Sequence, residues 1–209
     1  MSPNLNTWSK VEVDRAESTW GQIVPPYSKA LFDFAIKDCH SWLDLGCGFG
    51  RFLNYLTNLK ELPDYIGYDS SADMIARVSE RFPEYSSRVF KRDITAPINN
   101  SQNSIICSAV LIHLPKADQD KILNNVKAIN PVKFAFDINS PEESSIPKRP
   151  YFETRIKGSE SPFRMTWQSH YDMTRQVLST FPNYKLTQEF YIVNKTRKKV
   201  LYMLERNKA

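Results

Sequence analysis

The chain has 209 residues, of which 41% are hydrophobic and 12% aromatic. This length and composition suit one α/β domain with a filled core and exclude wholesale disorder. No apolar run reaches the roughly 18–20 residues that span a bilayer, and residues 1–10 lack a signal-peptide pattern. Three cysteines without metal-ligand spacing predict reduced thiols and no metal site. We therefore expect a cytoplasmic protein.

The net charge of +5 is concentrated in the last third of the chain. Residues 141–209 hold 13 Lys and Arg against 7 Asp and Glu. A basic face favours an anionic small molecule or a nucleic-acid backbone as partner. It is equally explained as a solvated surface that keeps the protein soluble. Charge alone therefore names no partner.

The pattern of apolar residues predicts two amphipathic helices, over 13–24 and 27–37, separated by two prolines. Strand-like runs then alternate with helical periodicity, which indicates a parallel sheet with crossover helices on both faces. The predicted strands cover 41–45, 65–68, 88–91, 104–111 and 132–138, and the helices cover 51–59, 72–82 and 118–129.

Beyond this alternating region, residues 140–170 form an irregular stretch rich in Pro, Ser and charge. Long segments of this kind in compact domains are often lids or binding loops. A helix is predicted over 171–181. Two strand-like runs, 185–193 and 198–205, are joined by a polar turn and predict an antiparallel hairpin.

The most informative pattern is Gly46-x-Gly48-x-Gly50 between a predicted strand and a predicted helix. Glycines at the end of a parallel strand let the backbone turn sharply and lie close to a ligand. Dinucleotide-binding proteins usually place the third glycine three residues after the second. Here Gly50 is two residues after Gly48, and Arg51 occupies the expected position. This spacing argues against a nicotinamide-dependent dehydrogenase, the first rival interpretation.

Two acidic residues follow neighbouring predicted strands. Asp69 closes the second strand, where its carboxylate could accept hydrogen bonds from both hydroxyls of a ribose; an acidic cap on the next helix is the alternative. Asp93 follows the third strand, where it could accept from an adenine amino group, but an aspartate that stabilises a local turn explains it almost as well.

Four segments in this order resemble the class I S-adenosylmethionine-dependent methyltransferases. Residues 43–50 (LDLGCGFG) look like the first motif of this family, and residues 67–75 (GYDSSADMI) like its acidic second motif. Residues 92–94 (RDI) resemble the third element. Residues 108–114 (SAVLIHL) are similar to the strand-four motif of the small-molecule branch. Together the matches span 41–139.

The resemblance implies a Rossmann-like, doubly wound α/β fold with a mainly parallel seven-stranded sheet and an antiparallel C-terminal hairpin. It implies one methyltransferase domain over 1–209, with N-terminal helices or a lid (1–40), a cofactor-binding core (41–139) and a substrate-side loop, helix and hairpin (140–209). One departure is Asn130-Pro131-Val132, where the family usually has a Pro-Gly-Gly turn.

The resemblance also implies S-adenosylmethionine as cofactor, S-adenosylhomocysteine as product, and no metal. The methionine part is expected at Asp44, Gly46 and Gly48, the ribose at Asp69, and the adenine at Met74, Asp93 and Ile94. The other residues expected to line the cofactor are Cys47, Gly50, Ser70, Ser108 and Ala109.

His113 is a candidate general base, since it lies at the carboxyl end of the fourth strand and its ordinary pKa of about 6.5 suits that task. A histidine that shapes the pocket floor is the alternative. His170 is a second candidate, because the resembling family brings this region near the acceptor. The further candidates for acceptor contact are Tyr27, Asp137, Asn139 and Trp167.

The acceptor class can be narrowed. Amino-directed nucleic-acid methyltransferases carry Asp/Asn-Pro-Pro-Tyr/Phe after strand four, and this chain lacks that motif. Cytosine-C5 methyltransferases need a nucleophilic cysteine, but Cys107 lies inside a predicted buried strand, where a thiol is inert. An O, N or C acceptor on a small metabolite remains, and an anionic one fits the basic last third. The alternatives are an RNA or protein acceptor, or a protein that binds the cofactor without catalysis. The basic residues that would serve either partner are Lys148, Arg149, Arg155, Lys157 and Arg164.

Overall fold

The computed structural model describes residues 8, 10–20, 24–61, 63–141, 151–154, 163–166, 168–194 and 197–208. The strands are β1 (Ser41–Leu45), β2 (Asp64–Asp69), β3 (Val89–Lys91), β4 (Ser104–Cys107), β5 (Lys133–Pro141), β6 (Tyr151–Thr154), β7 (Phe163–Thr166), β8 (Tyr184–Asn194) and β9 (Arg197–Arg206). The helices are α1 (Lys10–Trp20), α2 (Pro26–Ile36), α3 (Arg51–Thr57), α4 (Ala72–Arg81), α5 (Lys116–Ile129) and α6 (His170–Thr180), and the 3₁₀ turns are η1 (Pro83–Arg88) and η2 (Leu111–His113).

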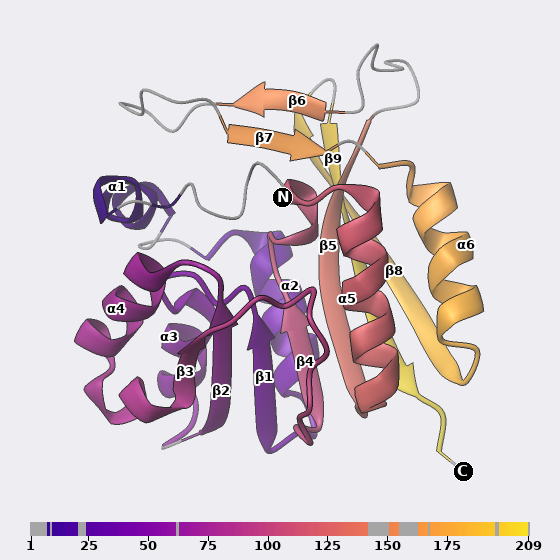
Figure 1. Ribbon diagram of the computed structural model, residues 1–209. Helices are drawn as coiled ribbons and strands as arrows, with labels where there is room; N and C mark the ends of the chain where they lie inside the picture. Colours follow the sequence, from indigo (N-terminus) through magenta and orange to yellow (C-terminus); the bar gives the residue numbers. More distant parts are fainter. Residues whose placement is uncertain are drawn as a thin grey trace.

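The central sheet has seven strands in the order β3-β2-β1-β4-β5-β9-β8 (Figure 1). Strands β1 to β5 pair in parallel, whereas β9 pairs antiparallel with both β5 and β8. The strand order reverses between β1 and β4, and open α/β sheets bind ligands at the carboxyl edge of such a switch point. The predicted doubly wound sheet with an antiparallel hairpin is confirmed.

Helices cover both faces of this sheet, and each face has its own apolar core. On one face, α2, α3 and α4 contribute buried residues such as Phe32, Leu53 and Val78. On the other face, α5 and α6 contribute residues such as Leu123 and Met173. The buried side chains of the central strands alternate between the two cores, as expected for strands covered on both sides. Among the described residues, no helix combines the length and apolar character needed to cross a membrane.

Helix α1 lies outside this sandwich and packs on α4 beside the glycine turn (Figure 1). Val13 and Ala16 are buried against Phe49 and Met74. Ion pairs reinforce the contact: Arg77 of α4 pairs with Asp14 and Glu17 of α1, and Arg81 also pairs with Glu17. The N-terminal segment is thus held against the part of the core that carries the glycines.

The predicted fourth strand, 104–111, is wrong at its carboxyl end. Strand β4 ends at Cys107, and the chain turns through Ala109, whose φ is +59°, into η2. Leu111 and Ile112 are buried within η2, so the apolar run reflects burial rather than a continued strand. The other elements predicted over 1–139 are present, with ends shifted by a few residues.

The segment expected to be irregular, 140–170, contains the end of β5 and a second sheet formed by β6 and β7, which pair antiparallel. This small sheet lies at the carboxyl edge of the central sheet (Figure 1). The Thr166 hydroxyl of β7 lies 3.4 Å from the carbonyl oxygen of Leu111 and donates to that of Ile112 at 3.2 Å. Strand β7 is therefore attached to η2, next to the end of β4.

Candidate active site

The glycine turn joins β1 to α3 at the switch point of the sheet. Its first amides, of Gly46 and Cys47, donate to the carbonyl of Tyr68 on β2 at 2.7 and 3.0 Å. Gly46 has a φ of +75°, and a Cβ there would lie 2.3 Å from Cγ2 of Val110. Gly48 has a φ of +54°, and within the described part of the chain a Cβ there would come within 4 Å only of the Met74 sulfur, at 3.9 Å. Val110 therefore packs tightly on Gly46, whereas the described residues leave space next to Gly48.

Asp69 connects this turn to the start of α4. Its Oδ2 accepts a hydrogen bond from the Gly48 amide at 2.9 Å, and its Oδ1 accepts from the Ser71 amide at 2.8 Å. Burial raises the pKa of Asp69, and the hydrogen bonds from backbone amides oppose that shift. The cap on α4 itself is Ser71, whose hydroxyl accepts from the Met74 amide. The carboxylate thus lies between the glycine turn and the amino end of α4.

Asp44 is buried in β1, just before the glycines, with an exposed fraction of 3%. Its Oδ2 accepts a hydrogen bond from the Tyr65 hydroxyl at 3.0 Å. Burial raises the pKa of Asp44 to about 7, the Asp69 carboxylate adds to the rise, and the Tyr65 hydroxyl and Arg51 oppose it. A carboxyl group in this state gains strongly from a nearby positive charge, because ionising it without one is costly.

The other residues expected around the cofactor differ in their surroundings. Cys47 has a buried thiol in the α2-side core, where burial raises its pKa, so a cofactor contact would have to come from its backbone. Met74 is buried beside Phe49 and Gly48, and Ile94 is buried in the opposite core. Asp93 is exposed, and its Oδ1 accepts from the amide and the hydroxyl of Thr95. These contacts match the local-turn interpretation of Asp93, and its adenine contact stays a prediction.

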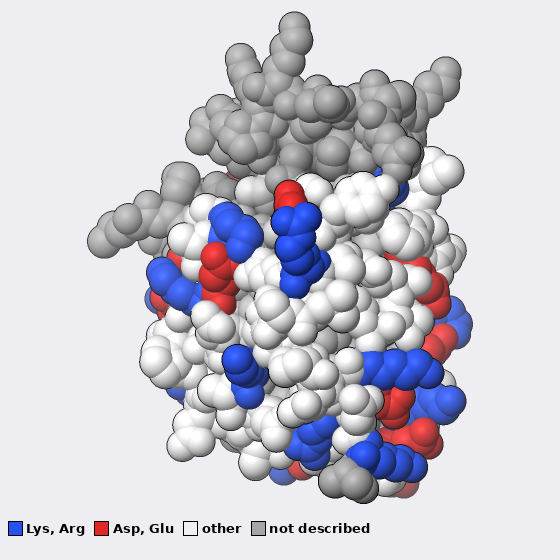
Figure 2. Space-filling model, turned by 90° about the vertical axis from the view of Figure 1, so that its right-hand side faces the viewer, with Lys and Arg blue, Asp and Glu red and all other residues white. Residues whose placement is uncertain are grey.

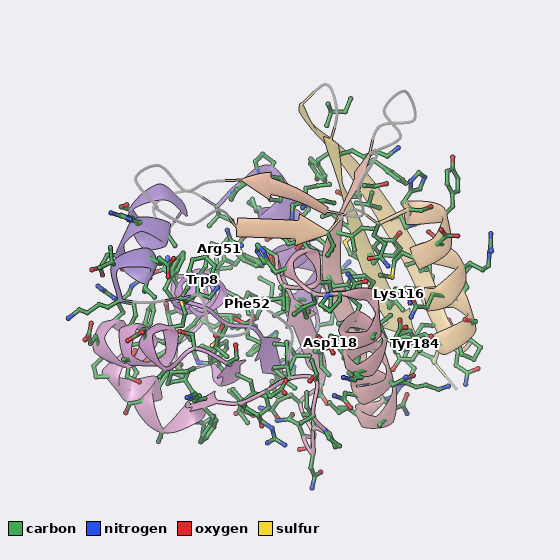
Figure 3. The ribbon with its side chains drawn as sticks, turned by 45° about the horizontal axis from the view of Figure 1, so that its top comes forward. Trp8, Arg51, Phe52, Lys116, Asp118 and Tyr184 are labelled. Carbon is green, nitrogen blue, oxygen red and sulfur yellow. The ribbon has the colours of Figure 1, made fainter. Side chains whose placement is uncertain are left out.

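His113 ends η2, the turn that follows β4 at the carboxyl edge. The residue is half-buried, and its backbone amide donates to the carbonyl of Val110 at 2.9 Å. Ser108 and Ala109 lie between β4 and η2, and η2 in turn contacts β7. Figure 3 turns this edge toward the viewer, with Trp8 and Arg51 labelled near the glycine turn. The structure thus places His113 at the edge where the sequence predicted it.

Asp137 and Asn139 are buried on the α2 side of β5, in the part of the strand that extends beyond the end of β4. Oδ2 of Asp137 forms an ion pair with Lys199 of β9, and its Oδ1 accepts from the Ala109 amide at 2.6 Å. The Lys199 ammonium lies 5.6 Å from the ring centroid of Tyr27 on α2. Tyr27, Asp137 and Asn139 are therefore brought together, around a lysine that the sequence analysis missed.

His170 lies in a different place, at the start of α6 on the opposite side of the sheet from Lys199. Its Nδ1 is 3.2 Å from the Ser140 hydroxyl, and its ring packs on Tyr171 and Phe190. The structure does not bring His170 together with Asp137 and Tyr27. The neighbouring candidate Trp167 lies outside the described residues.

No group of three or more His, Cys, Asp and Glu side chains within the described ranges is arranged to hold a metal ion. The arrangement that remains is an open turn with two acidic side chains beside it, and a polar cluster at the ends of β4, β5 and β9. Such a site can hold a positively charged nucleoside and orient a second molecule next to it.

Comparison with known proteins agrees with this arrangement. Residues 43–129, which contain the glycine turn, Asp69 and η2, match the methyltransferase domain family. No curated protein sequence matches the chain. Among solved structures, magnesium protoporphyrin IX methyltransferase from Synechocystis with bound SAM is similar, with a TM-score of 0.64 and 16% identity over 93% of this chain and 90% of that one.

Two further structures show the same fold. An S-adenosylmethionine-dependent methyltransferase from Clostridium acetobutylicum has a TM-score of 0.66 and 16% identity, over 95% of this chain and 98% of that one. A phosphoethanolamine N-methyltransferase from Haemonchus contortus has a TM-score of 0.69 and 12% identity, over 96% of this chain and 58% of that one. Residues 43–129 thus match the methyltransferase domain family, and the chain as a whole shares the fold of solved S-adenosylmethionine-dependent methyltransferases.

Proposed function

We propose that this protein transfers a methyl group from S-adenosylmethionine to a small-molecule acceptor held at the carboxyl edge of β4 and β5. The observation that carries the proposal is the open space at Gly48, next to the carboxylate of Asp69 and the sulfur of Met74. When bound, S-adenosylmethionine supplies a methyl group on a positively charged sulfur. Its ammonium group, sulfonium and ribose hydroxyls suit a turn flanked by two acidic residues.

Each acidic residue has a separate task in this proposal. Asp69 accepts hydrogen bonds from the ribose hydroxyls, because each carboxylate oxygen can accept more bonds than the one it accepts from Gly48 or Ser71. Asp44 balances the ammonium group of the methionine part, which favours its ionised form. Met74 and Ile94 supply apolar contacts to the adenine. The turn thus binds the methyl donor mainly by charge and by close approach of its backbone.

The acceptor side is built by η2 and the polar cluster behind it. His113 takes a proton from a hydroxyl or amine acceptor. Methylation places positive charge on the acceptor atom, which makes the proton on that atom more acidic. The remaining contribution to catalysis is the orientation of the two reactants, since alignment alone can lower an activation barrier by roughly 7–11 kcal/mol. Strand β7, attached to η2, and α1, attached to α4, flank the site on two sides and limit the access of water.

Two observations favour a small acceptor over RNA. The similar structures include proteins named for magnesium protoporphyrin IX and for phosphoethanolamine. On the face formed by α6 and β8, Lys and Arg side chains lie scattered among uncharged and acidic ones and form no continuous basic stripe in the described part (Figure 2). Of the basic residues singled out in the sequence, Lys148, Arg149, Arg155 and Lys157 lie outside the described residues, as does the side chain of Arg164.

The test is a transfer assay with methyl-labelled S-adenosylmethionine. A mixed cell extract is separated into a low-molecular-mass fraction, an RNA fraction and a protein fraction, and each is offered to the purified protein. We expect label in the low-molecular-mass fraction. Label only in RNA or protein would contradict the small-molecule proposal. Binding of S-adenosylhomocysteine without transfer to any fraction would favour a non-catalytic binding protein.

A further inference from the structure

We propose that the side-chain oxygen of Asp137, held in place by a buried ion pair with Lys199, sets the affinity for the methyl donor by positioning the turn after β4 against Gly46. This inference rests on the proposed function, because it places the donor at the glycine turn. Neither residue belongs to that turn: Asp137 lies on β5 and Lys199 on β9. Both are positioning residues in this role.

The first step is the ion pair itself. Asp137 and Lys199 are 1% and 6% exposed, so their charges lie in the protein interior and neutralise each other. A buried carboxylate that loses its cation turns away from its site, because an unpaired charge is strongly unfavourable there. Lys199 therefore holds the Asp137 carboxylate in place at the sheet edge.

The second step is the hydrogen bond from Asp137 to the turn. Its Oδ1 accepts from the Ala109 amide at 2.6 Å. Ala109 has a φ of +59°, a left-handed conformation that costs a residue with a Cβ energy and needs support from its surroundings. A hydrogen bond to an ionised acceptor is stronger than one between neutral groups, so the carboxylate provides that support.

The third step leads to the glycine turn. Val110 follows Ala109, and its Cγ2 fills the position next to Gly46 that a Cβ would otherwise need, at 2.3 Å. A change in the backbone at Ala109 would move Val110 and remove its packing contact with Gly46. The contacts thus run without a gap from Lys199 through Asp137 and Ala109 to Val110 and Gly46.

Two double variants separate the hydrogen bond from the charges. In Asp137→Asn with Lys199→Met, no charge is buried and the asparagine oxygen still accepts from Ala109. In Asp137→Ala with Lys199→Met, no charge is buried but the acceptor is lost. Val110→Ala tests the last contact without touching the pair, in a partly buried residue that packs at the border of the core.

Lys133→Met is the matched control. Lys133 is also a buried lysine, 2% exposed, but it lies at the amino end of β5, where its ammonium donates to the Lys37 carbonyl at 2.6 Å. It therefore serves the end of α2 at the opposite edge of the sheet. Its loss should lower the stability without changing the binding site.

The measurements are calorimetric affinity for S-adenosylhomocysteine and the exchange rate of the Ala109 amide. Asp137→Ala/Lys199→Met and Val110→Ala should bind at least about tenfold more weakly, because each variant loses one of the contacts that connect β5 with Gly46. Asp137→Asn/Lys199→Met and Lys133→Met should stay within about threefold of wild type. The Ala109 amide should exchange faster only in the variant that lacks the acceptor at position 137.

Wild-type affinity in both the Val110→Ala and the Asp137→Ala/Lys199→Met variants would overturn the inference, as would equal weakening by Lys133→Met. If the alanine double variant does not fold, Val110→Ala alone decides. A wild-type protein that fails to bind S-adenosylhomocysteine would contradict the proposed function instead, and the exchange rate of Ala109 would still test the positioning role.

Discussion

Replacing Asp44 with asparagine should stabilise the ligand-free protein at pH 8 and weaken its binding of S-adenosylhomocysteine. Asparagine fills nearly the same volume, and its side-chain oxygen can accept the hydrogen bond from Tyr65. It has no charge to bury. The variant therefore separates the cost of the buried carboxylate in the empty protein from its benefit when the ammonium of the ligand lies nearby.

The magnitude follows from the pKa of Asp44, which burial raises from 3.8 to about 7. This is a difference of about three units at about 1.4 kcal/mol each, so ionised Asp44 costs about 4 kcal/mol at pH 8. The sign follows from proton binding: between about pH 4 and pH 7 the folded state holds a proton that the unfolded state has lost. Stability from this group is present below pH 4 and is lost as the pH rises to 7.

The assay is urea unfolding of both proteins at pH 5 and pH 8. At pH 5 the cost of Asp44 is less than about 2 kcal/mol, so the advantage of the asparagine variant should grow by more than about 2 kcal/mol at pH 8. The groups that face Asp44, namely Tyr65, Cys47, Asp69 and Arg51, are the same in both proteins. An equal difference at the two pH values would refute the reasoning.

Three further changes test neighbouring parts of the account. Gly46→Ala should cost about 1–3 kcal/mol of stability by urea unfolding, because its φ is +75° and Val110 occupies the space; Gly46→Ala combined with Val110→Ala should recover part of the loss. The affinity for S-adenosylhomocysteine should rise with pH as Asp44 ionises, and Tyr65→Phe should move that rise to higher pH, because the Tyr65 hydroxyl stabilises the carboxylate. An unchanged calorimetric pH profile would contradict that role of Tyr65. His113→Ala should lower turnover roughly 100-fold or more in the transfer assay with little change in S-adenosylhomocysteine affinity, and wild-type turnover would remove it from the mechanism.

Much of the fold could be predicted because its signals are local. The apolar runs, the glycines and the polar hairpin turn indicated the parallel sheet and the antiparallel strands. The end of β4 could not be predicted in this way, because 104–111 is mostly apolar and Ser108 alone interrupts the run after Ile105. What ends the strand is the left-handed turn at Ala109 and its hydrogen bond to Asp137, 28 residues further along the chain.

The same distinction applies to the site. The glycine turn and Asp69 lie close together through the parallel pairing of β1 and β2, which the motif order already implied. Lys199 was missed because it lies in a basic run at the start of a predicted strand, where lysines are normally exposed. Two signals were available. Lys199 lies two residues before Leu201 and therefore on the same, buried side of β9, and Asp137 is the one acidic residue in a mostly apolar strand.

The most direct test of the donor site compares two aspartates at opposite ends of β2 by calorimetry with S-adenosylhomocysteine. Asp69 lies at the carboxyl end beside Gly48, whereas Asp64 lies at the amino end, exposed and paired with Arg88. Asp69→Ala should weaken binding by at least about 1.5 kcal/mol, and Asp64→Ala should not change it. Unchanged affinity in Asp69→Ala, or equal losses in both variants, would contradict a methyl-donor site at the glycine turn.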